Sequence, residues 1–277
     1  MVDFLYSHPT WEVGLVVIGI WTGLALLGLW IFQHLVDVKT RQEDTDTVGL
    51  TFAIVAVVYA VLIAFIVVDV FETSAKGEQI ATAEANKLSN LMLDSAGLPA
   101  QTAEGVRKDL DDYIDIVVKS EWPSQRAGKL GDAVFEPGWT VLAHLSARLA
   151  VFEPLTMGQN VNKGEMLHTV NELIKARRSR ILAAGEHLPL VVWQILLLAG
   201  AVAVGYTYLF GAHSFGIHVA ITGLISATIA LVFVLIIALD YPFRGEVSVG
   251  DEAFVNVKAT AAGALEPAAA EPRHVSH

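Results

Sequence analysis

The sequence predicts an all-α integral membrane protein with four transmembrane helices and a helical cytoplasmic insert between spans two and three. Three observations lead to this fold class: an apolar composition, four long uncharged runs, and helical periodicity between them. The 277 residues are 54% apolar and 17% charged, with a mean hydropathy of +0.53. Soluble domains usually contain about a quarter charged residues. The composition therefore argues against an ordinary cytosolic enzyme and excludes a disordered chain.

Four apolar runs are long enough to cross a bilayer. A helix rises about 1.5 Å per residue and the hydrocarbon core is about 30 Å thick, so about 20 residues suffice. Lipid offers no hydrogen-bond partner to an open backbone, which favours helices. The runs are Val13 to Phe32, Val48 to Val68, Leu188 to Phe210 and Ile217 to Leu239. The alternative, four buried helices of a soluble protein, would be unusual at this length.

The spans divide the sequence into five segments. We expect an N-terminal segment (1–12), spans one and two (13–70), the insert (71–187), spans three and four (188–240) and a C-terminal tail (241–277), disordered after about residue 258. Cations near span ends favour the cytoplasmic side. They gather on the side of the termini and the insert, at Lys76, Lys175, Arg177, Arg178, Arg180 and Arg244, against Lys39 and Arg41 on the other side. A multi-pass protein with both termini cytoplasmic is therefore predicted.

The insert reads as a set of amphipathic helices, because apolar residues recur at three- and four-residue steps. The predicted helices are Glu72 to Ala96, Pro99 to Glu121, Gly138 to Phe152, and a fourth from Gly164. Trp122-Pro123 is expected to end the second helix. Nothing in the sequence forces a break before Pro189, so we expect spans two and three to continue beyond the bilayer as long helices.

No pattern predicts catalysis, a cofactor or a metal site. The chain has no cysteine, which excludes thiol chemistry and cysteine-bound metals. Glu165, His168 and Glu172 share a helix face, but a di-iron bundle needs a second copy of this motif that the sequence lacks. The acidic group Asp109, Asp111, Asp112 and Asp115 lacks the features of a calcium loop and reads as a solvated face. The net charge of −11 argues against a nucleic-acid partner.

Span two carries two patterns that point to packing and to a pore. Small residues form a stripe that allows close helix approach, either within the chain or between subunits. The stripe comprises Gly49, Ala53, Ala56, Ala60 and Ala64, and span one adds Gly19 and Gly23. Phe52, Tyr59, Ile63 and Ile66 repeat on another face and could form a hydrophobic neck if several copies surround an axis. The spans contain no ionisable group near the bilayer centre, which fits an apolar, dewetting gate better than a proton relay.

Two sequence motifs resemble the bestrophin-like domain family of bacterial membrane proteins. The first is Arg177-Arg178-Ser179-Arg180-Ile181 followed by Leu188-Pro189 and Trp193, and the second is Leu239-Asp240-Tyr241-Pro242-Phe243-Arg244-Gly245. The motif positions of interest are Arg178, Arg180, Pro189, Trp193, Asp240, Pro242, Phe243 and Gly245. The likeness spans about Val48 to Gly245 and includes the order of spans and insert.

This resemblance implies a homo-oligomer distantly related to bestrophin anion channels, which are pentamers with a pore lined by the second span. It implies a bacterial inner-membrane location and small ions as partners beside the lipid bilayer. The calcium clasp of animal bestrophins has no recognisable counterpart in this sequence. We expect an anion-conducting channel, and the alternative is a non-conducting membrane scaffold or sensor whose insert binds a cytoplasmic partner.

Overall fold

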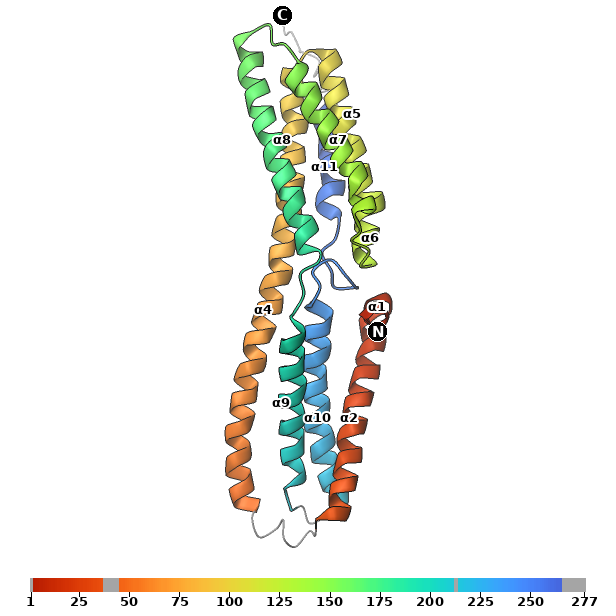
Figure 1. Ribbon diagram of the computed structural model, residues 1–277, viewed down its shortest axis with the longest axis vertical. Helices are drawn as coiled ribbons and strands as arrows, with labels where there is room; N and C mark the ends of the chain where they lie inside the picture. The colour runs from red at the N-terminus through yellow and green to blue at the C-terminus, as the bar shows by residue number, and fades with distance from the viewer. Residues whose placement is uncertain (1, 37–44, 212–213, 266–277) are drawn as a thin grey trace, which may run out of the picture. The chain divides into compact units, whose positions relative to one another are not determined.

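The computed structural model describes residues 2–36, 45–211 and 214–265, and all regular structure within these ranges is helical (Figure 1). The prediction of an all-α protein is therefore confirmed. The chain forms two compact units. We call residues 1–75 and 186–248 the membrane unit, and residues 76–185 and 249–277 the helical unit.

The membrane unit contains four helices that are long and apolar enough to cross a bilayer, as predicted. They are α2 (Thr10–Leu35), the first part of α4 (Thr45–Asp94), α9 (Leu190–Tyr208) and α10 (Phe215–Leu239), with a short α1 (Val2–Ser7) before them. Helix α4 has 50 residues and so measures about 75 Å, well beyond the bilayer core. The predicted continuation of span two as one long helix is confirmed.

Glycines allow the helices of the membrane unit to pack closely. A Cβ added to Gly200 of α9 would lie 2.8 Å from the Tyr59 hydroxyl and 3.2 Å from the ring of Phe233, so a larger residue there would separate α9 from α4 and α10. A Cβ on Gly14 of α2 would meet Val234 of α10 at 3.5 Å. Small residues thus serve close packing within lipid, although at positions other than those singled out in the sequence.

The helical unit contains the rest of α4, a 3-10 turn η1 (Ser95–Gly97), α5 (Ala100–Ile116), a π-helical turn η2 (Val117–Glu121), α6 (Trp122–Arg126), α7 (Asp132–Val151), α8 (Met157–Ala183) and α11 (Glu252–Leu265). Apolar side chains at helical spacing fill its interior, because they give each helix one apolar face. The fully buried ones include Leu88, Leu91, Val106, Leu110, Leu142, Leu145, Leu149, Met166 and Leu173.

Several helices are longer than the sequence predicted. The chain stays helical through Trp122-Pro123, because the wide turn of η2 leads into α6 with Pro123 in its first turn, a position that tolerates proline. Helix α7 starts at Asp132 rather than Gly138. Helix α8 starts at Met157 because the Thr156 hydroxyl accepts the Gln159 N–H, at 3.2 Å, as a helix cap.

Two expectations about the ends of elements are wrong. Span three does not continue from the insert as one helix: α8 ends at Ala183, and α9 begins only after Pro189, which has an extended backbone. The tail is helical through Leu265, where we expected loose chain after residue 258. Helix α11 forms because Phe254 and Val257 are buried. The expectation for residues 266–277 lies outside the described residues.

Candidate functional site

In the apolar first part of α4, the side that faces away from the other helices is a continuous apolar surface. We define the α4 outer face as Leu50, Ile54, Val57, Val61, Ala64, Phe65 and Val68. Val57, Val61 and Phe65 have exposed fractions of 63%, 50% and 72%. Most of these positions alternate in steps of four and three, the spacing by which one helix packs along another. The stretch from Val48 to Val68 carries no charge, and Asp69 and Glu72 follow it on the exposed side.

The residues predicted to form a neck lie on the opposite side of α4. Tyr59 and Ile66 are each 7% exposed and belong to the core of the membrane unit. The Tyr59 hydroxyl donates to the carbonyl of Leu196 in α9, at 3.4 Å. Phe52 and Ile63 are half-buried, and the Phe52 ring packs edge-on against Phe210. In this conformation the four side chains contact their own chain. The repeat did not predict this orientation, because α4 has two apolar sides and the spacing alone does not say which side faces inward.

The small residues of α4 divide between the two sides. Ala53, Ala60 and Ala64 are exposed, whereas Gly49 and Ala56 are half-buried. On α2, a Cβ added to Gly19 or Gly23 would meet no atom within 4 Å. These two glycines are exposed in the single chain, and the predicted close approach through them would have to involve another molecule.

Helix α2 presents an exposed tryptophan near each end. Trp11 is 65% exposed and Trp30 is 53% exposed. Their separation along the helix is about 28 Å, close to the thickness of the hydrocarbon core. Indole rings prefer the two membrane interfaces, so this arrangement fits a helix that faces lipid. Helix α4 contains no tryptophan, and Tyr59, its one tyrosine, is buried.

The Asp240 carboxylate joins α10 to the start of α9. Its Oδ1 accepts the Leu188 N–H at 2.6 Å, and its Oδ2 accepts the Trp193 Nε1–H at 3.2 Å. Pro189 lies between these donors and fixes the extended entry into α9. Burial raises the pKa of Asp240, while the hydrogen bonds from Leu188 and Trp193 act in the opposite direction. The motif residues Asp240, Pro189 and Trp193 thus form one structural joint.

The rest of this motif folds back onto the start of the chain. Phe243 is fully buried and Pro242 is buried beside it. The Arg244 guanidinium lies 5.1 Å from the centres of both the Tyr6 and Tyr241 rings. Gly245 has φ of +87°, a backbone conformation that favours glycine. The motif therefore holds a compact turn at the end of α10.

A buried ionic network lies at the centre of the helical unit. We define it as Glu84 of α4, Glu121 of η2, and Arg177 and Arg180 of α8, all with exposed fractions of 0%. Arg180 donates to Glu84 Oε2 at 2.7 Å and to Glu121 Oε2 at 2.8 Å. Arg177 donates to both oxygens of Glu121 at 2.7 and 3.0 Å. Two charges of each sign therefore balance inside the unit.

Two neutral side chains complete the network. The Tyr113 hydroxyl donates to Glu84 at 2.5 Å, and Gln125 accepts from Arg180 at 3.1 Å. Burial raises the pKa of Tyr113, and the Glu84 carboxylate raises it further. Burial alone would lower the pKa of Arg180, but its interactions with Glu84, Tyr113 and Glu121 together outweigh this effect, and the pKa is raised. Both arginines therefore remain charged, and their hydrogen bonds tie α8 to α4 and η2.

The sequence pointed to Arg180 but missed its partners. Glu84 is spaced four residues from both Ile80 and Leu88, so it lies on the apolar face of its helix. A carboxylate on an apolar face was the sequence signal that could have predicted a buried ion pair. Arg178, the other predicted arginine, is exposed beside an open groove lined by Trp139, Ile181 and Leu182.

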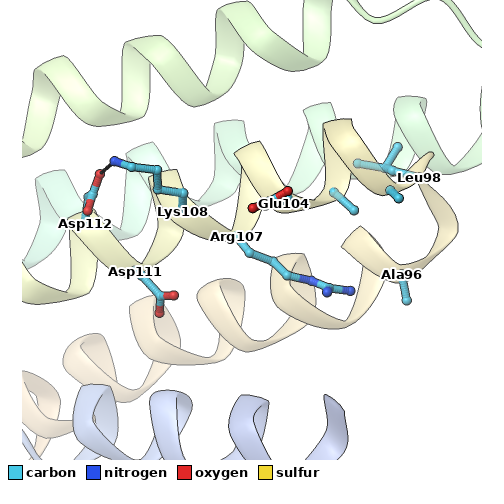
Figure 2. Close-up of a pocket in the computed structure, with 9 residues that line it drawn as sticks. Ala96, Leu98, Glu104, Arg107, Lys108, Asp111 and Asp112 are labelled. Atoms are coloured by element: carbon cyan, nitrogen blue, oxygen red, sulfur yellow. Dashed lines mark hydrogen bonds and ion pairs between the residues drawn. The ribbon is translucent and has the colours of Figure 1, made fainter. Parts of the chain in front are cut away.

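The acidic residues considered for metal binding are mostly paired with cations. Asp109 accepts from Arg148 at 2.8 Å, and Lys175 bonds Glu172 at 2.7 Å. Lys108 bonds Asp112 at 2.6 Å beside an open groove of about 730 Å³. Figure 2 shows this ion pair, with Asp111 and Arg107 on the same helix. Within the described residues, no group of three or more metal-ligating side chains comes together, Glu165 and His168 included.

Comparisons with known proteins agree with this fold. A crystal structure of a membrane protein superimposes with a TM-score of 0.64 and 14% sequence identity, covering 89% of this chain and 97% of that chain. This likeness concerns the fold alone. A search of curated proteins found no match. The model of the Bestrophin-like domain matches residues 19–254, and the chain therefore belongs to the Bestrophin-like domain family.

Proposed function

We propose that this protein is an oligomeric ion channel of the bacterial inner membrane, in which copies of the α4 outer face surround the pore. The observation that supports the proposal is the exposure of Val57, Val61 and Phe65, each at least half exposed in the single chain. Family membership and the predicted relation to bestrophins, which conduct through their second span, point to the same helix. We propose no enzymatic activity.

Lipid is the other environment that could cover an apolar face, and α2 and α4 differ in how well they suit it. Trp11 and Trp30 give α2 the two interface anchors of a lipid-facing helix. The α4 outer face has no such anchors, and Ala60 and Ala64 beside Val61 would let neighbouring copies approach closely. We therefore assign α2 to the lipid and α4 to the subunit axis.

An apolar pore gates by dewetting, because water and ions leave a narrow hydrophobic constriction. The ring formed by Val57, Val61 and Phe65 would supply such a constriction. We propose a pentamer with both termini cytoplasmic, by analogy with bestrophins and from the cations near the span ends.

Family resemblance implies anions as the permeant ions, whereas Asp69 and Glu72 place carboxylates on the exposed side of α4 after the apolar stretch. Rings of carboxylates favour cations. The reversal potential in a salt gradient distinguishes the two: anion selectivity shifts it in one direction and cation selectivity in the other. If Asp69 and Glu72 set the selectivity, Asp69→Asn with Glu72→Gln moves the reversal potential toward anions.

The direct test is ion flux in liposomes that contain the purified protein. We expect flux above that of empty vesicles, and a larger flux for Val61→Ser, since a hydroxyl keeps the constriction wet. Val16→Ser on α2 is the matched control, because Val16 is 45% exposed on the helix assigned to lipid. Equal effects of the two variants would contradict the pore assignment. Absence of flux from the wild type at several voltages and salts would reject the channel.

A further inference from the structure

A ridge of buried polar side chains runs along α10 inside the membrane unit. His218, Thr222 and Ser226 are spaced four residues apart, so they lie on one face of the helix. Their exposed fractions are 2%, 0% and 0%. Polar groups buried in an apolar bundle need hydrogen-bond partners, because leaving one without a partner costs free energy.

The first two members of the ridge have partners on α9. The His218 ring lies with its Nε2 2.8 Å from the carbonyl of Thr207, and the hydroxyls of Thr207 and Thr222 are 3.1 Å apart. Ser226 differs, because its buried Oγ has no hydrogen-bond partner among the described residues. The ridge therefore ends on an unpaired hydroxyl inside the bundle.

A second unpaired hydroxyl lies at the same level on α2. Helices α2 and α10 run antiparallel, with Gly14 at Val234 and Leu26 at Gly223. Thr22 lies eight residues after Gly14, and Ser226 lies eight residues before Val234, so the two residues are at the same level of the helix pair. The Thr22 Oγ1 is also buried without a partner among the described residues. Two buried, unpaired hydroxyls thus lie at the same level of the antiparallel α2–α10 pair.

We propose that Thr22 and Ser226 bind a buried water molecule between α2 and α10. Each hydroxyl can donate one hydrogen bond and accept others, and helix carbonyls keep a free lone pair, so a water there would find the two to four partners that it needs. The water would satisfy both hydroxyls and extend the polar ridge from α10 to α2. This site is independent of the pore proposed above, because Thr22 and Ser226 lie inside one chain.

A double-mutant cycle on the full-length protein tests whether the two hydroxyls share a partner. Thr22→Val and Ser226→Ala should each lower Tm by about 2–4 °C, and the double variant should lower it no further than the larger single effect, because both remove one bridge. Thr228→Val is the matched control: it is exposed on the same helix and its hydroxyl already bonds the Leu224 carbonyl. It should leave Tm unchanged.

Radiolytic labelling distinguishes a water bridge from a direct hydrogen bond, because hydroxyl radicals formed from bound water oxidise adjacent side chains. We expect oxidation of Trp21, next to Thr22, in the wild type and a several-fold loss in the double variant. A rise in Tm for both single variants would show that the hydroxyls are simply unpaired. Additive losses of Tm, or equal labelling of Trp21 in the two proteins, would also overturn the proposal.

Discussion

The guanidinium of Arg180 is the side chain whose loss should affect the helical unit most. Arg180→Met leaves Glu84 buried without its cation, and removing one partner of a buried pair costs about 3–5 kcal/mol. We expect this loss in the free energy of unfolding, measured by denaturant titration in detergent. Arg178→Met, two residues away on the exposed side, should change it by less than about 0.5 kcal/mol. Similar effects from both would contradict the assigned network.

Asp240 gives a second test at the scale of one residue. Asp240→Ala removes the acceptor of both the Leu188 N–H and the Trp193 indole N–H, and each buried unpaired donor costs about 1–3 kcal/mol. We expect a clear fall in Tm. Asp240→Asn keeps one carbonyl oxygen for Leu188 and should lose less. An asparagine variant as unstable as the alanine variant would show that the joint depends on charge rather than on hydrogen bonding.

The sequence predicted some of these residues and not their roles. Asp240, Pro189 and Trp193 stood out as a motif, but only the fold shows that one carboxylate joins them. Arg180 stood out as a cation near a span, whereas it pairs with Glu84, nearly a hundred positions earlier. Contacts between residues so distant in sequence depend on tertiary packing, which a local pattern does not encode.

At the scale of one element, we expect the docking of α11 to depend on pH. Lys258 of α11 and Lys119 donate hydrogen bonds to Asp115, and these bonds lower the pKa of that carboxyl. A lowered pKa means that the contact stabilises the fold above the unfolded value, about pH 4, and is lost as pH falls through the folded value. We expect the backbone amides of Glu252 to Lys258 to exchange hydrogen faster once the pH falls below the folded pKa of Asp115. The exchange rates are corrected for the intrinsic effect of pH on amide exchange.

The control for this prediction is Asp115→Asn, which lacks the titrating group. Its α11 should exchange at a rate that no longer depends on pH across the window. An unchanged pH dependence in this variant would assign the effect to another carboxyl and contradict the role of Asp115.

Periodicity predicted the existence of most helices, and it failed at their ends. The four spans emerged from length and apolarity alone, and the apolar faces of α5, α7 and α8 from their three- and four-residue spacing. The Thr156 cap starts α8 earlier than predicted, and the π turn carries the chain through Pro123 as a helix. Backbone geometry decides both boundaries. At the break before α9, Asp240 binds the Leu188 N–H from far along the chain, a contact that the local sequence does not reveal.

At the scale of the whole molecule, the channel proposal depends on which side of α4 faces the axis. The repeat in span two predicted a pore-lining face containing Phe52, Tyr59, Ile63 and Ile66, and the fold places that side against α9. The sequence alone could not predict which side of α4 packs against its own chain, because both sides are apolar. The outer face containing Val57 and Val61 is the side that stays exposed in the single chain.

Because the natural chain contains no cysteine, single-cysteine variants measure this choice directly. Val57→Cys and Val61→Cys test the α4 outer face, and Ile63→Cys and Ile66→Cys test the inner side, with flux recorded before and after a charged, membrane-impermeant thiol reagent. The proposed arrangement predicts that the reagent changes flux through the first pair and leaves the second pair unaffected. Modification of flux at Ile63 and Ile66 alone would contradict it.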